Sequence, residues 1–297
     1  MTGSKIRTFF RVMLVALLAV IAAGAVFAAY CIVRAPSISV LDAKPHGYRS
    51  NVLDKDGNVV LTLSGEESNR VYVKLSEVPE SLQEAVVAIE DERFYEHFGI
   101  DPKGIARALY RGITEGNFSE GASTITQQLL KNNVFTDWMN ETTFLQKVER
   151  KIQEQYLAVA LEMHVNKDWI LENYLNTINL GGGNWGVETA AKYYFDKNVS
   201  DLTLSESAVL AGITRNPTRY NPITNPEANA ERREYILDKM LSLGYITQEE
   251  RDEAAADDVY ARISDISTNG GTQEVMTYFE DAMIYSVLHD LMSEKGC

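Results

Sequence analysis

The sequence predicts a mainly α-helical protein that has a small β-hairpin region and one apolar helix near its N-terminus. The apolar helix is predicted by a long uncharged run, Val12 to Val33. The hairpin is predicted by Asn51 to Leu63, and the helical body by apolar residues at helical spacing from Pro79 to Leu243. About 180 helical residues are enough to build one core, so we expect a single helical domain outside the apolar helix.

The uncharged run from Val12 to Val33 is long enough to cross a membrane. It holds 22 residues, which reach roughly 33 Å at about 1.5 Å per residue. A cleaved signal peptide has a shorter apolar region of about 7–15 residues, so the run favours an uncleaved anchor over cleavage. Lys5, Arg7 and Arg11 precede the run, and only Arg34 follows it closely. By the positive-inside rule, the N-terminus lies in the cytoplasm and the residues after the run lie outside.

Charge and cysteine content add little about the class of protein. The net charge is −14, but twelve acidic and three basic residues lie between Gln248 and the end, so most of the excess belongs to the tail. The two cysteines, Cys31 and Cys297, leave no internal disulfide framework. No metal-ligand spacing is found among the four histidines, which are His46, His97, His164 and His289.

The secondary-structure elements after the uncharged run are predicted from local signals. Asn51 to Leu63 read as two short strands around an Asp-Lys-Asp-Gly turn. Pro79 to Gly99 reads as one helix that begins at the proline and stops at the glycine. Its apolar face holds Leu82, Val86 and Ile89. Further helices are expected to begin near Ser123, Phe144, Asn166, Leu204 and Pro226, and at a capping box that starts with Thr247.

Three polar stripes on the predicted helices are candidates for a functional site. The first lies in GASTITQQLLKNN, with Ser123 as the N-cap, and its members are Thr124, Gln127, Gln128 and Lys131. The second lies in AIEDERFYEHFG, and its members are Glu90, Phe94 and His97, flanked by Arg93. The third lies in LQKVERKIQEQYLAVALE, and its members are Lys147, Arg150, Lys151 and Glu154. For any one stripe alone, the plain alternative is a solvated face held by ion pairs between neighbouring turns.

The second and third stripes together indicate a group transfer. Glu90 closes an apolar stripe, so it lies at the edge of the core, where a carboxylate can take a proton from a sugar hydroxyl. Glu154 lies among three cations, and such a cluster suits a polyanionic leaving group, because Lys and Arg stabilise negative charge on phosphate oxygens. A base at the nucleophile and a cationic patch at the leaving group are the outline of a transferase.

Five segments of the sequence carry a resemblance to a known family. In chain order they are EDERFYEHFGID, GASTITQQLLKN, RKIQE, ILENYLNTINLGGGNWGVETAAKYYF and LAGITRNPTRYNP. Together they resemble the five motifs of the peptidoglycan glycosyltransferases, glycosyltransferase family 51, over roughly Asn51 to Ala256. The anchor and hairpin at the start and YFEDAMIYSVLHDL near the end resemble the N-terminal half of a bifunctional class A penicillin-binding protein.

The resemblance implies a fold, an activity and a set of partners. The implied fold is a lysozyme-like α-helical domain, and the implied activity is polymerisation of lipid II on the outer face of the cytoplasmic membrane. The sugar would be transferred with inversion, and undecaprenyl pyrophosphate would be the leaving group. The implied partners are lipid II, the growing lipid-linked glycan, the membrane and other proteins of cell-wall synthesis and division, with no nucleic acid.

The resemblance also implies roles for individual residues. Glu90 becomes the general base. Glu154 becomes the second catalytic carboxylate, near the pyrophosphate and a divalent cation, Mg²⁺ or Mn²⁺. The implied substrate-binding residues are Phe94, His97, Ser123, Gln127, Gln128, Lys131, Arg150 and Lys151.

Two features depart from the family pattern. The segment NVFTDWMNETTFLQK, between the second and third motifs, is longer than the family leads us to expect. Its Phe135, Trp138, Met139 and Phe144 either dip into the membrane interface or simply pack. No Ser-x-x-Lys occurs in the sequence, so the acyl-serine transpeptidase half is not expected, whether through truncation or as a natural monofunctional form.

The expected organisation divides the chain into five parts. A cytoplasmic tail at 1–11 precedes a transmembrane anchor at 12–33, and a linker with the hairpin follows at 34–75. The glycosyltransferase domain is expected at 76–256. Residues 257–297 are expected to be a linker, a last helix and the start of a following transpeptidase region.

Two other classes of function stay open at this point. A peptidoglycan hydrolase on the same lysozyme-like fold would also use a glutamate, but its glycan leaving group carries no phosphate and needs no cationic stripe. A non-catalytic membrane scaffold for cell-wall proteins would have no reason to keep both carboxylates and Lys131.

Overall fold

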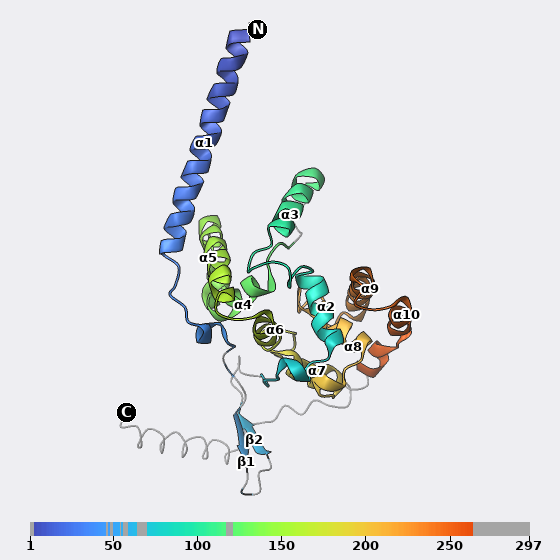
Figure 1. Ribbon diagram of the computed structural model, residues 1–297. Helices are drawn as coiled ribbons and strands as arrows, with labels where there is room; N and C mark the ends of the chain where they lie inside the picture. The colour runs from blue at the N-terminus through green and yellow to red at the C-terminus, as the bar shows by residue number, and fades with distance from the viewer. Residues whose placement is uncertain are drawn as a thin grey trace, which may run out of the picture.

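The computed structural model confirms a mainly α-helical fold with one apolar helix at the N-terminus (Figure 1). It describes residues 3–45, 47, 50–53, 55, 59–63, 70–116 and 121–263. The linker and last helix expected at 264–297 lie outside the described residues.

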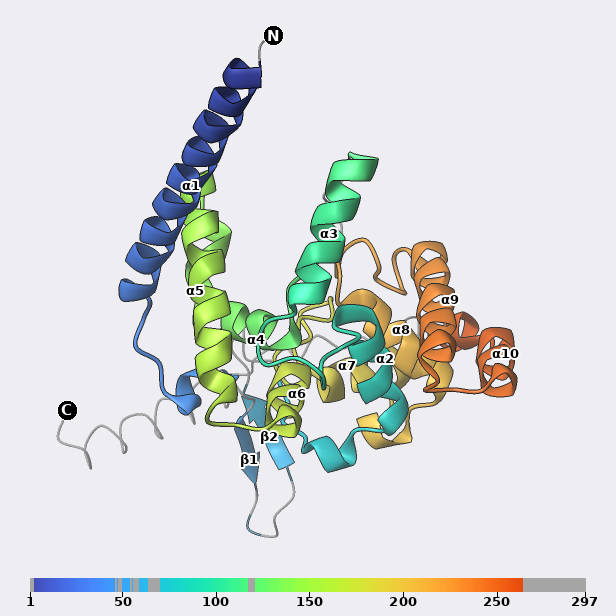
Figure 2. The ribbon, with the colours of Figure 1, turned by 45° about the horizontal axis from the view of Figure 1, so that its top comes forward.

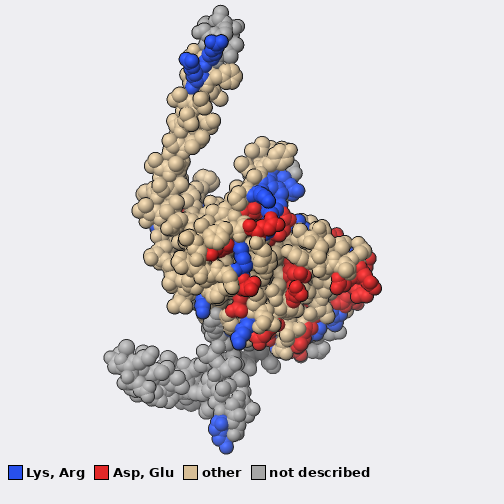
Figure 3. Space-filling view, viewed as in Figure 1, with Lys and Arg blue, Asp and Glu red and all other residues tan. Residues whose placement is uncertain are grey.

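The N-terminal helix α1 (Gly3–Val33) extends away from the helical body. Its stretch Arg7–Val33 is the one described helix that is long and apolar enough to cross a membrane, judged by length and composition. Figure 3 shows basic side chains near its N-terminal end and an uncharged surface below them. Its other end is tied to the body, because Gln153 Nε2 donates to the Cys31 carbonyl at 3.1 Å and Arg34 pairs with Glu149 at 3.2 Å.

The predicted hairpin is confirmed in its strands. Strand β1 (Ser50–Leu53) pairs antiparallel with β2 (Val59–Leu63), and the register shifts by one residue between Val52 and Leu53. Most of the turn that joins the strands lies outside the described residues.

The helical body surrounds one almost fully buried helix, α8 (Leu204–Ile213). All of its residues from Ser205 to Ile213 are buried, and it packs against α2 and α9 (Figure 2). The other helices of the body are α2 (Glu80–Glu90), α3 (Pro102–Glu115), α4 (Ile125–Asn133), α5 (Phe144–Glu162), α6 (Lys167–Leu175), α7 (Val187–Phe195), α9 (Pro226–Leu243) and α10 (Gln248–Ala256).

Most predicted helix starts are confirmed. Helices α5, α8 and α9 begin at the predicted residues, and Asn166 and Thr247 are the N-caps of α6 and α10. Helix α4 differs by one residue. Its N-cap is Thr124 rather than Ser123, because the Thr124 hydroxyl accepts from the Gln127 N–H at 3.2 Å.

The helix predicted from Pro79 to Gly99 is wrong in its second half. Helix α2 ends at Glu90, and Asp91 leaves the helical region at φ −158° and ψ 73°. The Asp91 carboxylate accepts from the Ile125 N–H at 3.0 Å and lies 2.9 Å from His97 Nε2. These contacts with distant backbone outweigh the local helical pattern, so Glu90, Phe94 and His97 do not share one helix face.

Two helices, α3 and α7, were not individually predicted. Figures 1 and 2 show α3 rising from the body on the side where α1 extends, and its Leu109, Tyr110 and Ile113 are exposed. Helix α7 follows the glycine-rich run Leu180–Gly186. The four glycines of this run have φ from 61° to 81°, a backbone region that other residues rarely adopt.

Candidate active site

A polar cleft of about 890 Å³ is lined by residues of α2, α3, α4, α5 and α9 and by the residues that follow α8. The last turn of α2 supplies Glu90, and the residues after it supply Asp91, Glu92 and Arg93. The other polar side chains that line it are Asp101, Arg107, Arg111, Ser123, Thr124, Gln128, Lys131, Lys151, Thr214, Arg215, Arg232, Tyr235 and Lys239.

Glu90 is held in this cleft by neutral donors from two sides. Gln128 Nε2 donates to one carboxylate oxygen at 2.9 Å, and the Thr214 hydroxyl donates to the other at 2.5 Å. The buried Tyr174 hydroxyl donates to Gln128 Oε1 at 3.2 Å and so fixes the amide. Burial, with the charges of Glu90 and Asp91, raises the pKa of Tyr174, so its hydroxyl stays protonated and remains a donor. The Glu90 carboxylate therefore has a defined orientation.

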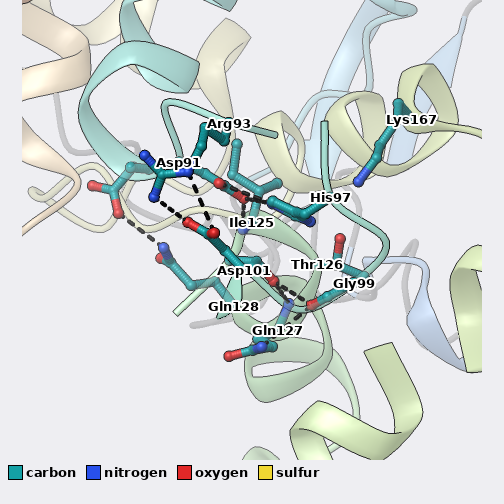
Figure 4. A network of polar contacts seen from close by, with 12 residues as sticks. Asp91, Arg93, His97, Gly99, Asp101, Ile125, Thr126, Gln127, Gln128 and Lys167 are labelled. Atoms are coloured by element: carbon teal, nitrogen blue, oxygen red, sulfur yellow. Dashed lines mark hydrogen bonds and ion pairs between the residues drawn. The ribbon is translucent and has the colours of Figure 1, made fainter. Parts of the chain in front are cut away.

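The loop after Glu90 is fixed by contacts beneath the cleft (Figure 4). Asp91 lies between His97 and the start of α4, and Arg93 donates to Asp101 at 2.5 and 3.3 Å. Phe94 is fully buried, and Lys167 Nζ lies 4.5 Å from its ring centroid. These contacts hold the chain so that Glu90 faces the cleft.

Three of the predicted substrate-binding residues support this loop. Phe94 and His97 belong to the loop itself, and the buried Gln127 donates to the Gly99 carbonyl at 3.2 Å. Thr124 donates to the same carbonyl at 2.8 Å. Phe94, His97 and Gln127 are absent from the cleft lining, so any contact that they make with substrate stays a prediction.

The cationic side of the cleft is built on α4 and α5. Lys151 Nζ donates to the Ser123 hydroxyl at 2.9 Å and to Glu154 Oε2 at 2.6 Å. Glu154 is fully buried, and its other oxygen accepts from Arg150. Arg150 also donates to Glu141 at 2.7 Å and lines a second cavity of about 410 Å³ rather than the cleft. The structure thus brings Ser123, Lys151 and Glu154 together, with Glu154 below the cleft surface.

Lys131 lines the cleft in an unusual environment for a lysine. Its ammonium lies 3.5 Å from the centroid of the Trp138 ring. Burial, together with the charge of Lys151, lowers the pKa of Lys131. Among the described residues its ammonium makes no hydrogen bond or ion pair, although the charges of Glu154 and Glu141 act on it from further away.

The structure adds cleft residues that sequence reasoning missed. Thr214 and Arg215 follow α8, and Arg232 lies on α9. Burial, with the neighbouring charge of Arg215, lowers the pKa of Arg232. Thr214 and Arg215 lie in the quoted segment LAGITRNPTRYNP, which was one available signal, whereas nothing local marks Arg232 as a cleft residue.

Glu92 joins three elements at one edge of the cleft. Its carboxylate pairs with Arg93 in the loop, Arg107 on α3 and Lys239 on α9. Burial raises the pKa of Glu92, but hydrogen bonds from Lys239 and Arg107 outweigh that effect and hold it at about 2. Glu92 is therefore a structural anion that remains charged at neutral pH.

The described side chains of this cleft do not form a metal site by themselves, so the divalent cation implied by the family resemblance stays a prediction. Asp91 faces His97, Asp101 faces Arg93, Glu92 faces three cations, and both oxygens of Glu154 face Lys151 and Arg150. Across the described part of the chain, no group of three or more His, Cys, Asp or Glu side chains could hold a metal ion. We assign no step of the reaction to a resident metal.

Comparison with known proteins gives several matches. A family model described as Transglycosylase matches residues 56–241. Penicillin-binding protein 1F of Bacillus subtilis is 47% identical over 201 residues, which cover 68% of this chain and 27% of that protein. Penicillin-binding protein 1A of Clostridium perfringens strain 13 is 42% identical over 271 residues, which cover 88% of this chain and 37% of that protein. A crystal structure of penicillin-binding protein 1A from Haemophilus influenzae aligns over 72% of this chain and 21% of that chain, at 25% identity and a TM-score of 0.39.

The chain spans 27% and 37% of the lengths of these two curated relatives. The matched range 56–241 contains Glu90, both cationic helices and the segment after α8. Since the family model covers more than half of the chain and includes every wall of the cleft, the chain belongs to the transglycosylase family.

Proposed function

We propose that this chain is a peptidoglycan glycosyltransferase that polymerises lipid II. The observation that carries the proposal is the oriented Glu90 carboxylate, which lies in a cleft that also contains lysine and arginine side chains. Membership of the transglycosylase family and relatives named penicillin-binding proteins support it.

In this proposal Glu90 is the general base. The 4-hydroxyl oxygen of the acceptor sugar attacks the anomeric carbon of the donor, and Glu90 takes the hydroxyl proton. The bond from the anomeric carbon to the pyrophosphate oxygen breaks, and the lipid pyrophosphate leaves with that electron pair. Attack opposite to the leaving group inverts the anomeric carbon. Gln128 and Thr214 hold the carboxylate in place for the transfer.

The cations of the cleft would stabilise the pyrophosphate. Lys131 on α4 lies three residues after Gln128, Arg215 lies directly after Thr214, and both cations line the cleft that holds Glu90. Lys151 adds a third charge, with its position set by Glu154. Preorganised cations stabilise the negative charge that grows on the leaving oxygen as the bond breaks. Glu154 acts through Lys151 and Arg150 rather than by contact with the reacting atoms.

We further propose that the reaction takes place at the outer face of the cytoplasmic membrane. Helix α1 would cross the membrane with its basic N-terminal end inside. The exposed Leu109, Tyr110 and Ile113 of α3 lie on the side where α1 extends and would enter the membrane interface beside it. A lipid-linked substrate could then reach the cleft without leaving the bilayer. Other proteins of cell-wall synthesis and division stay predicted partners.

The test is to supply the purified full chain with fluorescent lipid II and to resolve the products on a gel. Ladders of glycan strands that vanish in Glu90→Gln would support the proposal. Shortening of preformed glycan without polymer would instead favour the hydrolase, and no change in either substrate would favour the scaffold.

A further inference from the structure

We propose that Trp138 is a positioning residue that holds the Lys131 ammonium on its indole face and releases it to the pyrophosphate of an incoming substrate. The proposal rests on the phosphate role of Lys131 in the proposed function. It assigns a role to the long segment between α4 and α5, which the family resemblance left unexplained.

The contact itself is close, and no carboxylate among the described residues forms an ion pair with Lys131. Lys131 Nζ lies 3.5 Å from the Trp138 ring centroid, well within the range of a cation–π interaction. Two other cations at the cleft pair with carboxylates, Lys151 with Glu154 and Lys239 with Glu92, and a third, Arg232, lies over the Tyr220 ring at 5.6 Å. No described carboxylate pairs with Lys131.

An aromatic partner has a different consequence from a carboxylate partner. A carboxylate would neutralise Lys131 and compete with phosphate for its protons. The indole face attracts the ammonium through its quadrupole but leaves the positive charge in place. Burial and Lys151 lower the pKa of Lys131 more than the charges of Glu154 and Glu141 raise it, so the indole face adds to the groups that favour the charged ammonium. A phosphate oxygen binds an ammonium more strongly than a ring does, so the exchange is favourable when substrate arrives.

The segment that carries Trp138 is tied down at both of its ends. The short 3₁₀ helix η3 (Thr136–Asn140) follows α4 directly, and the Phe135 N–H donates to the Leu130 carbonyl at 3.2 Å. At its other end Glu141 accepts from Arg150 of α5 at 2.7 Å. The backbone that carries Trp138 therefore has a fixed place relative to α4 and α5.

The second cavity gives the indole ring room to respond. Trp138 lines this cavity of about 410 Å³ together with Phe135 and Arg150. When Lys131 moves to phosphate, the ring can shift into this space without disturbing the core. The sequence-based alternatives for Trp138, membrane insertion or plain packing, give no reason for its contact with a cleft lysine.

The first test measures the ring directly. The full chain in detergent is titrated with inorganic pyrophosphate while tryptophan emission is recorded, and binding is followed separately by calorimetry. Of the three tryptophans, Trp138, Trp169 and Trp185, we expect Trp138 to carry the emission change. Trp138→Phe should therefore lose the change, whereas the control Trp169→Phe, which removes a tryptophan that lines neither the cleft nor the second cavity, should keep it.

The second test measures turnover of lipid II. Trp138→Leu should raise KM about three- to tenfold, and Trp138→Phe should recover part of the loss because it retains a weaker ring face. Thermal unfolding of both variants identifies any loss of folding. Wild-type KM in Trp138→Leu, or pyrophosphate binding without an emission change, overturns the proposal. Absence of polymer from the wild-type chain would instead reject the proposed function, and the pyrophosphate titration would still decide the role of Trp138.

Discussion

Glu90 differs from the other carboxylates of the cleft in the kind of partner that it has. Asp101 and Glu92 pair with cations, whereas Glu90 accepts hydrogen bonds from an amide and a hydroxyl. Because no described cation forms an ion pair with Glu90, its carboxylate can meet a substrate hydroxyl without first leaving a cation.

Replacing Glu90 by Gln should lower the rate of lipid II polymerisation by about 10²–10⁴-fold, because Gln keeps the shape of the side chain but cannot take the proton. The thermal unfolding midpoint should change little. The matched control is Glu84→Gln on the same helix, which lies outside the cleft lining and should polymerise normally. Polymerisation by Glu90→Gln within about tenfold of wild type would contradict the assignment of the base.

Replacing Lys131 by Ala should strongly weaken lipid II turnover, and Lys131→Arg should recover only part of it. Arg keeps the charge but replaces a compact ammonium with a planar fork. Steady-state polymerisation and thermal unfolding are measured on the same variants. The control is Lys147→Ala, since Lys147 belongs to the third polar stripe but is exposed and does not line the cleft. Normal activity in Lys131→Ala would remove its phosphate role.

At the scale of elements, the Glu92 cluster joins the loop after α2 to α3 and α9. Through Glu92, Arg107 of α3 and Lys239 of α9 contact the same carboxylate. Removing the charge of Glu92 should therefore weaken the connection between α3 and α9 at this edge of the cleft.

This cluster gives a prediction about pH. The pKa of Glu92 is lowered in the folded chain from 4.5 to about 2, so its contribution to stability is present above about pH 4.5 and is lost as the pH falls toward 2. Glu92→Gln should be less stable than wild type at pH 7, and the difference should narrow between pH 4.5 and pH 2. Chemical unfolding across this range checks it. A constant difference at all pH values would show that the charge of Glu92 does not matter.

At the scale of the whole molecule, the question is which side of the membrane carries the cleft. Protease added to intact spheroplasts should remove the helical body and leave a small membrane-bound stub that contains α1, because the basic residues precede the span. Immunoblotting with an N-terminal tag follows the stub. Complete protection of the chain would reverse the topology, and recovery of a mature chain that lacks residues 1–30 would establish cleavage instead.

Sequence alone determined the features that depend on near neighbours along the chain. The starts of α5, α8 and α10 follow from capping boxes at Thr143, Thr203 and Thr247, in which a side chain bonds to backbone three residues away. The uncharged run and the cationic face of α5 could also be predicted from the sequence, because composition and helical spacing are local properties.

Tertiary structure alone decided where α2 ends and what surrounds Glu90. Asp91 stops the helix through contact with Ile125, and the partners of Glu90 lie 38 residues away at Gln128 and 124 residues away at Thr214. It also placed Glu154 below the cleft, and it set Trp138 against Lys131. Local spacing shows which side chains share a helix face, but the partner that a buried polar group finds depends on how separate elements pack, because desolvation requires each group to be satisfied wherever the fold places it.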